Sequence, residues 1–200
     1  MRAVLASRNQ AKLRELQQIL APIGYDLVCQ EELGIPSPEE TGSTFIENAL
    51  IKAKAASCAG QLPAFADDSG IVVPSLDGAP GIYSARFAGE QASDADNNAK
   101  LVSMLERESQ RHAYYYCAMV FLENADDPTP LIATASWHGT ITTRPRGQHG
   151  FGYDPYFLVD GLDITSAEMD PAEKNRVSHR ARAIGALVNL LNGQRQTRPT

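Results

Sequence analysis

Length, composition and charge place this chain among ordinary globular proteins. Its 200 residues are 43% hydrophobic and 21% charged, which suits one folded domain of moderate size. The formal net charge of −6 argues against a nucleic-acid-binding module, because such proteins usually carry a basic surplus that neutralises phosphates. The three cysteines are widely spaced and form no Cys-x-x-Cys pair, so they predict neither a disulfide framework nor a zinc knuckle.

Targeting signals are absent from the sequence as given. The apolar run within residues 1–7 is too short for a signal peptide. No stretch approaches the roughly 18 apolar residues that a membrane-spanning helix needs. We therefore expect a cytoplasmic protein that binds neither a membrane nor nucleic acid.

The first part of the chain alternates predicted strands and helices. Leu13 and Leu16 belong to an apolar series with helical spacing, and Thr44 followed by Glu47 has the spacing of a capping box. The Asp-Ser-Gly sequence at 68–70 has the composition of a turn and is expected to interrupt a strand. The predicted elements are strands at 2–6, 25–29, 64–67 and 71–76, and helices at 10–21 and 44–58.

The second part contains two long neighbouring strands. The predicted elements are a helix at 93–108 opened by Ser93 or Asp94, strands at 113–122, 130–138, 139–143 and 156–159, and a last helix at 178–192 that ends near Gly193. This order predicts an α/β fold with a mixed, elongated β-sheet flanked by helices, arranged as two lobes around a cleft. Residues 1–193 are expected to form a single domain, and 194–200 a flexible C-terminal tail.

Two polar segments follow or precede predicted helices. Ser7-Arg8-Asn9-Gln10-Ala11-Lys12 opens a helix, whose N-terminus offers free backbone N–H groups and a positive dipole end to an anion. Lys12 adds a point charge suited to phosphate, although a plain capped helix with a solvated lysine explains the same residues. Glu39 and Glu40 precede the Thr44 helix, where they either favour the helix dipole or bind a hard cation.

Two adjacent aspartates end the apolar strand at 64–67. Asp67 and Asp68 point to opposite faces if the strand is regular, so only one is expected to serve a given site. Carboxylates at a buried sheet end cost free energy unless a cation or hydrogen-bond donors compensate them. A solvated turn remains the alternative to a carboxylate that holds magnesium and orients water.

The last polar segment combines aromatic, glycine and charged residues. In an extended segment Phe151 and Tyr153 would share one face and hold a planar ring between them, and Gly152 would let the backbone approach that ring. Core packing of the two aromatic rings is the alternative. Residues that are candidates for reading base edges or phosphates are Asp154, Lys174, His179 and Arg180.

Taken together, these segments resemble the inosine triphosphate pyrophosphatase family, also called the dITP/XTP pyrophosphatases. The likeness spans residues 2–192 and keeps order and spacing. Its motifs are Ser7-x-Asn9-x-x-Lys12, Glu40-Thr41-Gly42-x-Thr44-Phe45-x-Glu47-Asn48-Ala49, Ala66-Asp67-Asp68-Ser69-Gly70, Gly78-Ala79-Pro80-Gly81-Ile82-Tyr83-Ser84-Ala85-Arg86, Gly150-Phe151-Gly152-Tyr153-Asp154-Pro155 and Glu173-Lys174-x-x-x-Ser178-His179-Arg180. Arg8 departs from the pattern, since many relatives carry glycine there.

The resemblance implies a magnesium-dependent enzyme that cuts purine nucleoside triphosphates with the wrong base, such as ITP, dITP and XTP, to monophosphate and pyrophosphate. It also implies a homodimer with a nucleotide-binding cleft. Glu40 and Asp68 would hold Mg²⁺, and Asp68 would also activate the attacking water. The implied ligands of the triphosphate are Ser7, Asn9 and Lys12, within a stretch that also includes Arg8, Gln10 and Ala11, and Ser69 would contact phosphate. The implied base pocket consists of Phe151, Gly152, Tyr153 and Asp154. The residues that would close this pocket are Lys174, His179 and Arg180.

Two other functions remain open at this point. A nucleotide-binding sensor without hydrolysis would keep Phe151, Tyr153 and Lys12, but it would not need both Glu40 and Asp68. A hydrolase of the same layout that acts on other nucleoside triphosphates, including modified pyrimidines, is the second alternative. The nature of the product and the base preference distinguish these functions.

Overall fold

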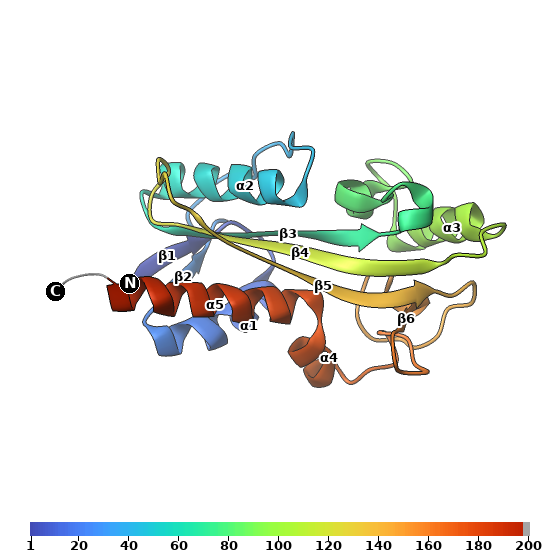
Figure 1. Cartoon of the computed structure of the whole chain (residues 1–200). Coiled ribbons are helices and arrows are strands. Elements are labelled where there is room, and N and C mark those ends of the chain that lie inside the picture. The colour runs from blue at the N-terminus through green and yellow to red at the C-terminus, as the bar shows by residue number, and fades with distance from the viewer. Residues whose placement is uncertain (198–200) are drawn as a thin grey trace. The chain divides into compact units, whose positions relative to one another are not determined.

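The computed structural model describes residues 1–197, except for the side chains of Ala11 and of residues 195–197. Its fold is α/β, with six strands in one mixed sheet of order β2-β1-β3-β4-β5-β6 and helices against the sheet (Figure 1). This confirms the predicted fold class. The strands are β1 (Arg2–Leu5), β2 (Asp26–Cys29), β3 (Ala64–Val72), β4 (His112–Leu122), β5 (Leu131–Ile141) and β6 (Phe157–Val159).

The helices agree with the predicted ones except near the C-terminus. They are α1 (Gln10–Leu20), α2 (Phe45–Gly60), α3 (Asp94–Leu105), α4 (Pro171–Val177) and α5 (His179–Thr197). Sequence reasoning missed the short α4, and the expected end of α5 near Gly193 is wrong, because the helix continues to Thr197. Residues 198–200 lie outside the described part of the chain, so the flexible tail at 194–200 stays a prediction.

The chain divides into two compact units, each made of several segments. Unit 1 comprises Met1–Asp68, Ala118–Thr134 and the chain from Ala183 onward, and unit 2 comprises Ser69–Cys117 and Ala135–Arg182. The long strands β3, β4 and β5 and the helix α5 each contribute residues to both units. Two lobes around a cleft stay a prediction.

In unit 1, β1 pairs in parallel with both β2 and β3, as expected for strands connected through helices. Helix α2 covers one face of this part of the sheet, and α1 and α5 cover the other (Figure 1). The rings of Tyr25, Phe65 and Phe121 pack together with centroids 4.7 to 5.5 Å apart. Because β1 ends at Leu5, which is paired with Phe65, the following residues of β3 extend past the carboxyl end of β1.

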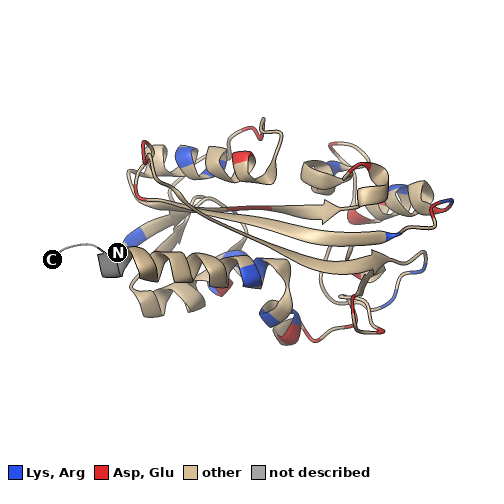
Figure 2. Ribbon diagram, viewed as in Figure 1, with Lys and Arg blue, Asp and Glu red and all other residues tan. Residues whose placement is uncertain are grey.

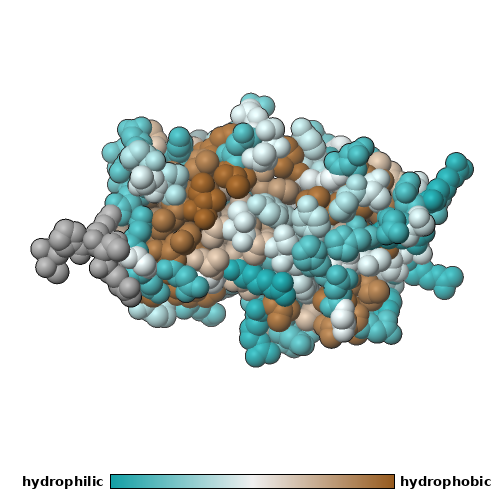
Figure 3. Space-filling model, viewed as in Figure 1, coloured by the Kyte–Doolittle hydropathy of each residue, from teal (hydrophilic) through white to brown (hydrophobic). Residues whose placement is uncertain are grey.

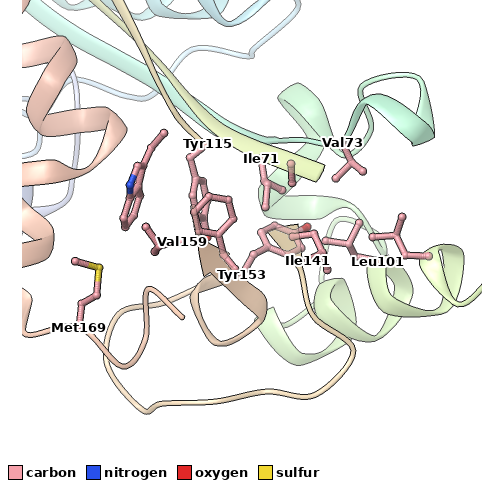
Figure 4. Packing of buried hydrophobic residues seen from close by; sticks show 12 residues of the cluster. Ile71, Val73, Leu101, Tyr115, Ile141, Tyr153, Val159 and Met169 are labelled. Carbon is pink, nitrogen blue, oxygen red and sulfur yellow. The ribbon is translucent and has the colours of Figure 1, made fainter. Parts of the chain in front are cut away.

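Unit 2 has its own hydrophobic core. Buried side chains from β3, β4, β5, β6, α3 and the adjoining loops form a cluster that includes Ile71, Leu101, Tyr115, Ile141 and Tyr153 (Figure 4). Strand β6 pairs antiparallel with β5. A large buried apolar cluster of this kind provides most of the stabilisation of a unit of this size.

Two predicted breaks in strands are absent. Residues 68–70 continue β3 instead of forming a turn, and residues 131–141 form the single strand β5 instead of two. The backbone N–H of Ile71 donates to Ser84 Oγ at 2.9 Å, so the polar stretch is anchored by a distant side chain. Tertiary pairing overrides the local turn preference of Asp, Ser and Gly here.

The surface is mixed in character. On the face shown in Figure 3, apolar side chains gather beside α2 in unit 1. None of the helices in the described part of the chain is long and apolar enough to cross a bilayer.

Gly139 provides a test of the close packing of β6 on β5. A Cβ atom at Gly139 would lie 2.4 Å from the carbonyl oxygen of Leu158 and 2.6 Å from Cζ of Phe157. We expect Gly139→Ala to lower the free energy of unfolding by about 2 kcal/mol or more, measured by urea denaturation. Gly185→Ala is the control, because nothing lies within 4 Å of its Cβ position and alanine stabilises a helix interior by about 0.5–1 kcal/mol. Equal effects of the two substitutions would contradict this account of the strand pairing.

Candidate functional site

The turn between β1 and α1 forms a capped helix start in unit 1. Asn9 Oδ1 accepts from the backbone N–H of Lys12 at 3.2 Å, so Asn9 is the N-cap of α1. Ser7 Oγ accepts from the N–H of Asn9 at 3.1 Å, and the Ser7 carbonyl accepts from the buried Cys29 thiol at 2.6 Å. These bonds fix the course of the backbone before the first turn of α1.

Lys12 points from α1 towards β3. Its ammonium lies 2.9 and 2.8 Å from the two carboxylate oxygens of Asp67, whose side chain is only 2% exposed. Burial of a carboxylate costs free energy because the charge loses its hydration, and the two contacts with the Lys12 ammonium offset this cost. The predicted phosphate-binding lysine is therefore held by the first of the two adjacent aspartates.

Asp68 leaves β3 on the opposite face, towards α2. The ammonium of Lys52 on α2 donates to Asp68 Oδ1 at 2.8 Å and to Glu40 Oε1 at 2.9 Å. Figure 2 shows the acidic stretch within β3 and the basic turns of α2. The prediction that strand alternation separates Asp67 from Asp68 is confirmed, and Glu40 and Asp68 meet at one cationic nitrogen.

The loop that carries Glu40 is tied to the first turn of α2. Thr44 and Glu47 form the predicted capping box, with Glu47 N–H donating to Thr44 Oγ1 and Thr44 N–H donating to Glu47 Oε2. Gly42 N–H donates to Asn48 Oδ1 at 2.8 Å, and a Cβ at Gly42 would lie 2.6 Å from Cβ of Glu47. Only glycine allows this close approach. Nδ2 of the fully buried Asn48 has no partner within the described part of the chain.

Asp68 and Lys52 have shifted pKa values. Burial raises the pKa of the Asp68 carboxyl, and the nearby carboxylates of Glu40 and Asp67 raise it further, while Lys52 opposes the shift. Burial lowers the pKa of Lys52, but the charge and hydrogen bond of Asp68, with Asp67 and Glu40, outweigh burial and leave the pKa raised. Lys52 therefore stays protonated and holds the two carboxylates together.

Glu40 and Asp68 fit a divalent cation by donor chemistry and by placement. Magnesium takes carboxylate oxygens and usually keeps several waters, so one or two protein carboxylates with substrate phosphates suffice. The Lys52 ammonium shows that both carboxylates reach a single positive charge. Among the residues that the structure describes, no group of three or more His, Cys, Asp and Glu side chains is suited to a metal, which excludes a closed all-protein cage there.

In unit 2, the carboxylate of Asp154 is the centre of a hydrogen-bonded cluster and is 2% exposed. Oδ1 accepts from the Tyr115 hydroxyl at 3.2 Å and from the Ser166 hydroxyl at 2.9 Å. Oδ2 accepts from the N–H of Phe151 at 2.9 Å and from the ammonium of Lys174. Since a carboxylate has about four acceptor sites, its capacity is filled by the protein itself.

The predicted arrangement of Phe151 and Tyr153 on one face of an extended segment is wrong. Gly150 and Gly152 adopt φ values of +79° and +61°, which turn the chain sharply between them. Phe151 is 65% exposed, whereas Tyr153 is 4% exposed and donates from its hydroxyl to the Ser84 carbonyl at 2.8 Å. The two rings therefore do not form two walls of one slot, and core packing, the alternative reading, holds for Tyr153.

Helix α3 also holds this turn. Asp94 Oδ2 accepts from Gly152 N–H at 2.7 Å, and Asn98 Nδ2 donates to the Gly152 carbonyl at 2.8 Å. Both peptide groups of Gly152 are thus fixed by the first turns of one helix. The exposed Phe151 ring is presented by a turn that is anchored on both sides.

The remaining predicted residues of unit 2 lie around the α4–α5 junction. Asp170 caps α4, and the Lys174 ammonium on this helix lies 5.4 Å from the centroid of the Phe151 ring. His179 is 7% exposed and stacks parallel on Tyr115, with centroids 4.8 Å apart and planes 9° apart. Arg180 Nη2 lies 3.5 Å from Ser69 Oγ, at the outer limit of a hydrogen bond.

Each unit thus gathers one part of the predicted site. In unit 1 the structure brings together Lys12 with Asp67, and Glu40 with Asp68. In unit 2 it gathers Phe151, Gly152, Asp154, Lys174, His179, Arg180 and Ser69, together with the buried Tyr153. Arg8 and Gln10 are exposed at the start of α1, and the side chain of Ala11 lies outside what the structure describes.

Sequence reasoning missed Lys52, Tyr115 and Ser166. Lys52 lies four residues after Asn48 and four before Ala56, on the face of α2 that carries small buried residues, and a lysine at that position was a usable signal. Tyr115 and Ser166 gave no such signal, since an alternating strand and a polar loop explain them equally well. Their role depends on contacts with Asp154 that are distant in the sequence.

The sequence and the fold of this chain are similar to those of known proteins. A dITP/XTP pyrophosphatase of Burkholderia pseudomallei is 55% identical over 193 residues, covering 95% of this chain and 93% of its own. The solved structure of a HAM1 protein from Coxiella burnetii is 45% identical and has a TM-score of 0.93, covering 96% of this chain and 99% of its own. The Staphylococcus aureus Ham1 protein is 38% identical with a TM-score of 0.90, covering 97% of this chain and 100% of its own. Residues 3–190 match the Ham1 family, and the chain belongs to this family.

Proposed function

We propose that this protein hydrolyses purine nucleoside triphosphates with the wrong base, such as ITP, dITP and XTP, to the monophosphate and pyrophosphate with the help of Mg²⁺. The single observation that carries the proposal is the convergence of the Glu40 and Asp68 carboxylates on one cationic nitrogen. Membership of the Ham1 family and high identity to dITP/XTP pyrophosphatases support the substrate class. A sensor that only binds nucleotide would not need both carboxylates.

The residues of unit 1 suit the polyphosphate and its cation. Glu40 and Asp68 would hold Mg²⁺, which when bound would neutralise phosphate charge and polarise the phosphoryl oxygens. Lys12 and the N-terminus of α1, with Ser7 and Asn9, would bind phosphate oxygens through the ammonium, the free N–H groups and the dipole. Lys52 adds a second positive charge, and the unpartnered Nδ2 of Asn48 adds a buried donor.

The chemical step is attack of water on the α-phosphorus. The oxygen of water forms the new bond to phosphorus, the bond to the bridging oxygen breaks, and pyrophosphate leaves with that electron pair. In this proposal Asp68 would accept the proton that the water loses. Most of the catalysis comes from positioning and from neutralisation of charge that builds up on phosphate oxygens, as is general in phosphoryl transfer.

The residues of unit 2 suit the base. The exposed ring of Phe151 offers a flat surface for stacking, and Lys174 is held over that ring by Asp154. We propose that Lys174 and Arg180, with backbone N–H groups, donate to the 6-keto group of inosine or xanthosine. Adenosine has a 6-amino group in that position, so the same donors would stay unpaired and the complex would be weaker.

Asp154 and Tyr153 act through other groups in this proposal. The carboxylate of Asp154 has no free acceptor site for a base, because four donors of the protein fill it. Its contribution is to orient Lys174 and the turn of Phe151. Tyr153 fixes the same turn by its buried ring and its bond to Ser84.

The homodimer and the cytoplasmic location stay predictions. Apolar surface beside α2, visible in Figure 3, is of the kind that favours association with another protein and supports the dimer.

The function predicts a defined product and a base preference. With Mg²⁺ and a panel of ITP, dITP, XTP, GTP, ATP and dUTP, we expect pyrophosphate as the first product, measured against orthophosphate. The kcat/KM for ATP should be about 100-fold or more below that for ITP, because of unpaired donors. Orthophosphate as the first product would indicate a phosphatase instead, absence of any product a sensor, and preference for dUTP a hydrolase of other nucleotides.

Asp68→Asn removes the proposed proton acceptor and one metal-binding oxygen while keeping the side-chain shape. We expect kcat to fall at least about 100-fold and measurable binding of ITP to remain, because Lys12, Phe151 and Lys174 are untouched. Asp77→Asn, in an exposed turn of left-handed conformation that asparagine also favours, is the matched control. Full activity of Asp68→Asn would remove this residue from the mechanism.

Gly150→Ala tests whether the Asp154 cluster supports the base-binding turn. A Cβ at Gly150 would lie 2.0 Å from Asp154 Oδ2, so the carboxylate would have to leave Lys174 and Phe151 N–H. We expect the free energy of unfolding to fall by about 3 kcal/mol, as for other broken buried ion pairs. Gly152→Ala shares the backbone strain of positive φ but meets open space, and should cost only about 1–2 kcal/mol. Similar losses in the two variants would show that backbone strain alone governs this turn.

A further inference from the structure

Two histidines in unit 2 face one another on neighbouring strands and have no part in the proposed hydrolysis. His112 begins β4 and His138 lies near the end of β5, and both side chains are exposed. Their neighbours Ala113, Trp137 and Gly139 point to the buried face, so both imidazoles lie on the outer face of the sheet. Nε2 of His112 and Nδ1 of His138 are 3.4 Å apart.

The distance between these two nitrogens is long for a direct hydrogen bond. Nitrogen–donor hydrogen bonds in proteins cluster at about 2.9–3.0 Å. Two imidazole nitrogens bound at about 2.0–2.1 Å to one tetrahedral ion are instead separated by about 3.4 Å, which follows from the tetrahedral angle. The observed 3.4 Å therefore agrees with the spacing of two ligands on one metal ion.

The ring orientation has the same implication. The planes of the two imidazoles differ by 28°, and their centroids are 5.4 Å apart, which is farther than the nitrogens. The rings consequently meet along their nitrogen-bearing edges and do not overlap face to face. An ion that binds both rings would lie between these two nitrogens.

The surrounding structure holds the two histidines in this arrangement. Tyr114, on the same face of β4, has its ring centroid 5.4 Å from that of His138 and 6.4 Å from that of His112. Asp160 N–H donates to the His138 carbonyl at 3.2 Å, and Ile141 N–H donates to the Arg111 carbonyl at 2.9 Å. Both strands are thus anchored on either side of the pair, which lowers the entropy that binding would cost.

We infer that His112 and His138 form a surface site for one transition-metal ion that prefers imidazole, namely Zn²⁺, Ni²⁺ or Cu²⁺. Waters complete the coordination, because in the described part of the chain no third His, Cys, Asp or Glu joins the pair. Mg²⁺ is excluded from this pair by its preference for oxygen ligands. The site is separate from Glu40 and Asp68, which belong to unit 1 and offer only oxygen.

Calorimetric titration with Zn²⁺ in the presence of excess Mg²⁺ tests the inference, because the Mg²⁺ occupies oxygen sites. We expect one Zn²⁺ per chain, with the affinity falling at least about tenfold in His112→Asn and in His138→Asn. His149→Asn, which changes an exposed histidine outside the pair, is the matched control and should bind as the unchanged protein does. Absence of binding, or binding that survives both substitutions of the pair, would overturn the inference.

A double variant distinguishes a shared ion from two separate weak sites. If one ion bridges both rings, His112→Asn combined with His138→Asn should lose little more affinity than either single substitution. If the rings bound two separate ions, each single variant would instead keep one site of unchanged affinity, and that outcome would overturn the shared site. Both single variants should keep Mg²⁺-dependent hydrolysis of ITP and the unfolding temperature of the unchanged protein, so failure of this inference is distinguishable from failure of the proposed function and from misfolding.

Discussion

The placement of two adjacent aspartates in one strand governs the chemistry of unit 1. Because side chains alternate along β3, Asp67 and Asp68 leave the backbone on opposite faces, and each meets a lysine from a different helix. Neither carboxylate tolerates its buried position without such a partner. The packing of α1 and α2 on the two faces of the sheet is therefore tied to charge as well as to apolar burial, and the same pairing fixes where Lys12 and Glu40 point.

In unit 2, one buried carboxylate is likewise stabilised, here by four hydrogen-bond donors. Asp154 gathers a tyrosine, a serine, a lysine and a backbone N–H, and these come from β4, two loops and α4. A half-satisfied buried carboxylate would be costly, so the cluster tends to be complete or to be lost as a whole. The backbone of Phe151 is consequently held by hydrogen bonds on both sides although its ring is open to solvent, which suits the stacking role proposed for it.

Local patterns predicted the elements that depend on neighbouring residues, and they failed where distant contacts decide. The capping box at Thr44 and the opposite orientation of Asp67 and Asp68 follow from spacing alone, and the structure confirms them. The strand through residues 68–70 and the burial of Tyr153 depend on Ser84, which lies elsewhere in the sequence. The position of Lys52 on the small-residue face of α2 marked it as unusual, but its partners Glu40 and Asp68 are brought to it only by folding.

The ammonium of Lys52 has a consequence for the order in which charges assemble. It already neutralises part of the repulsion between Glu40 and Asp68, so a bare divalent ion gains less there than it would between two unpaired carboxylates. A divalent ion that is bound to polyphosphate would also bring anionic phosphate oxygens. The Lys52 ammonium, once displaced from Glu40 and Asp68, could pair with these oxygens. If Mg²⁺ binds between Glu40 and Asp68 as proposed, Lys52 would act as an internal counter-ion that disfavours binding of the bare ion and favours its binding together with the nucleotide.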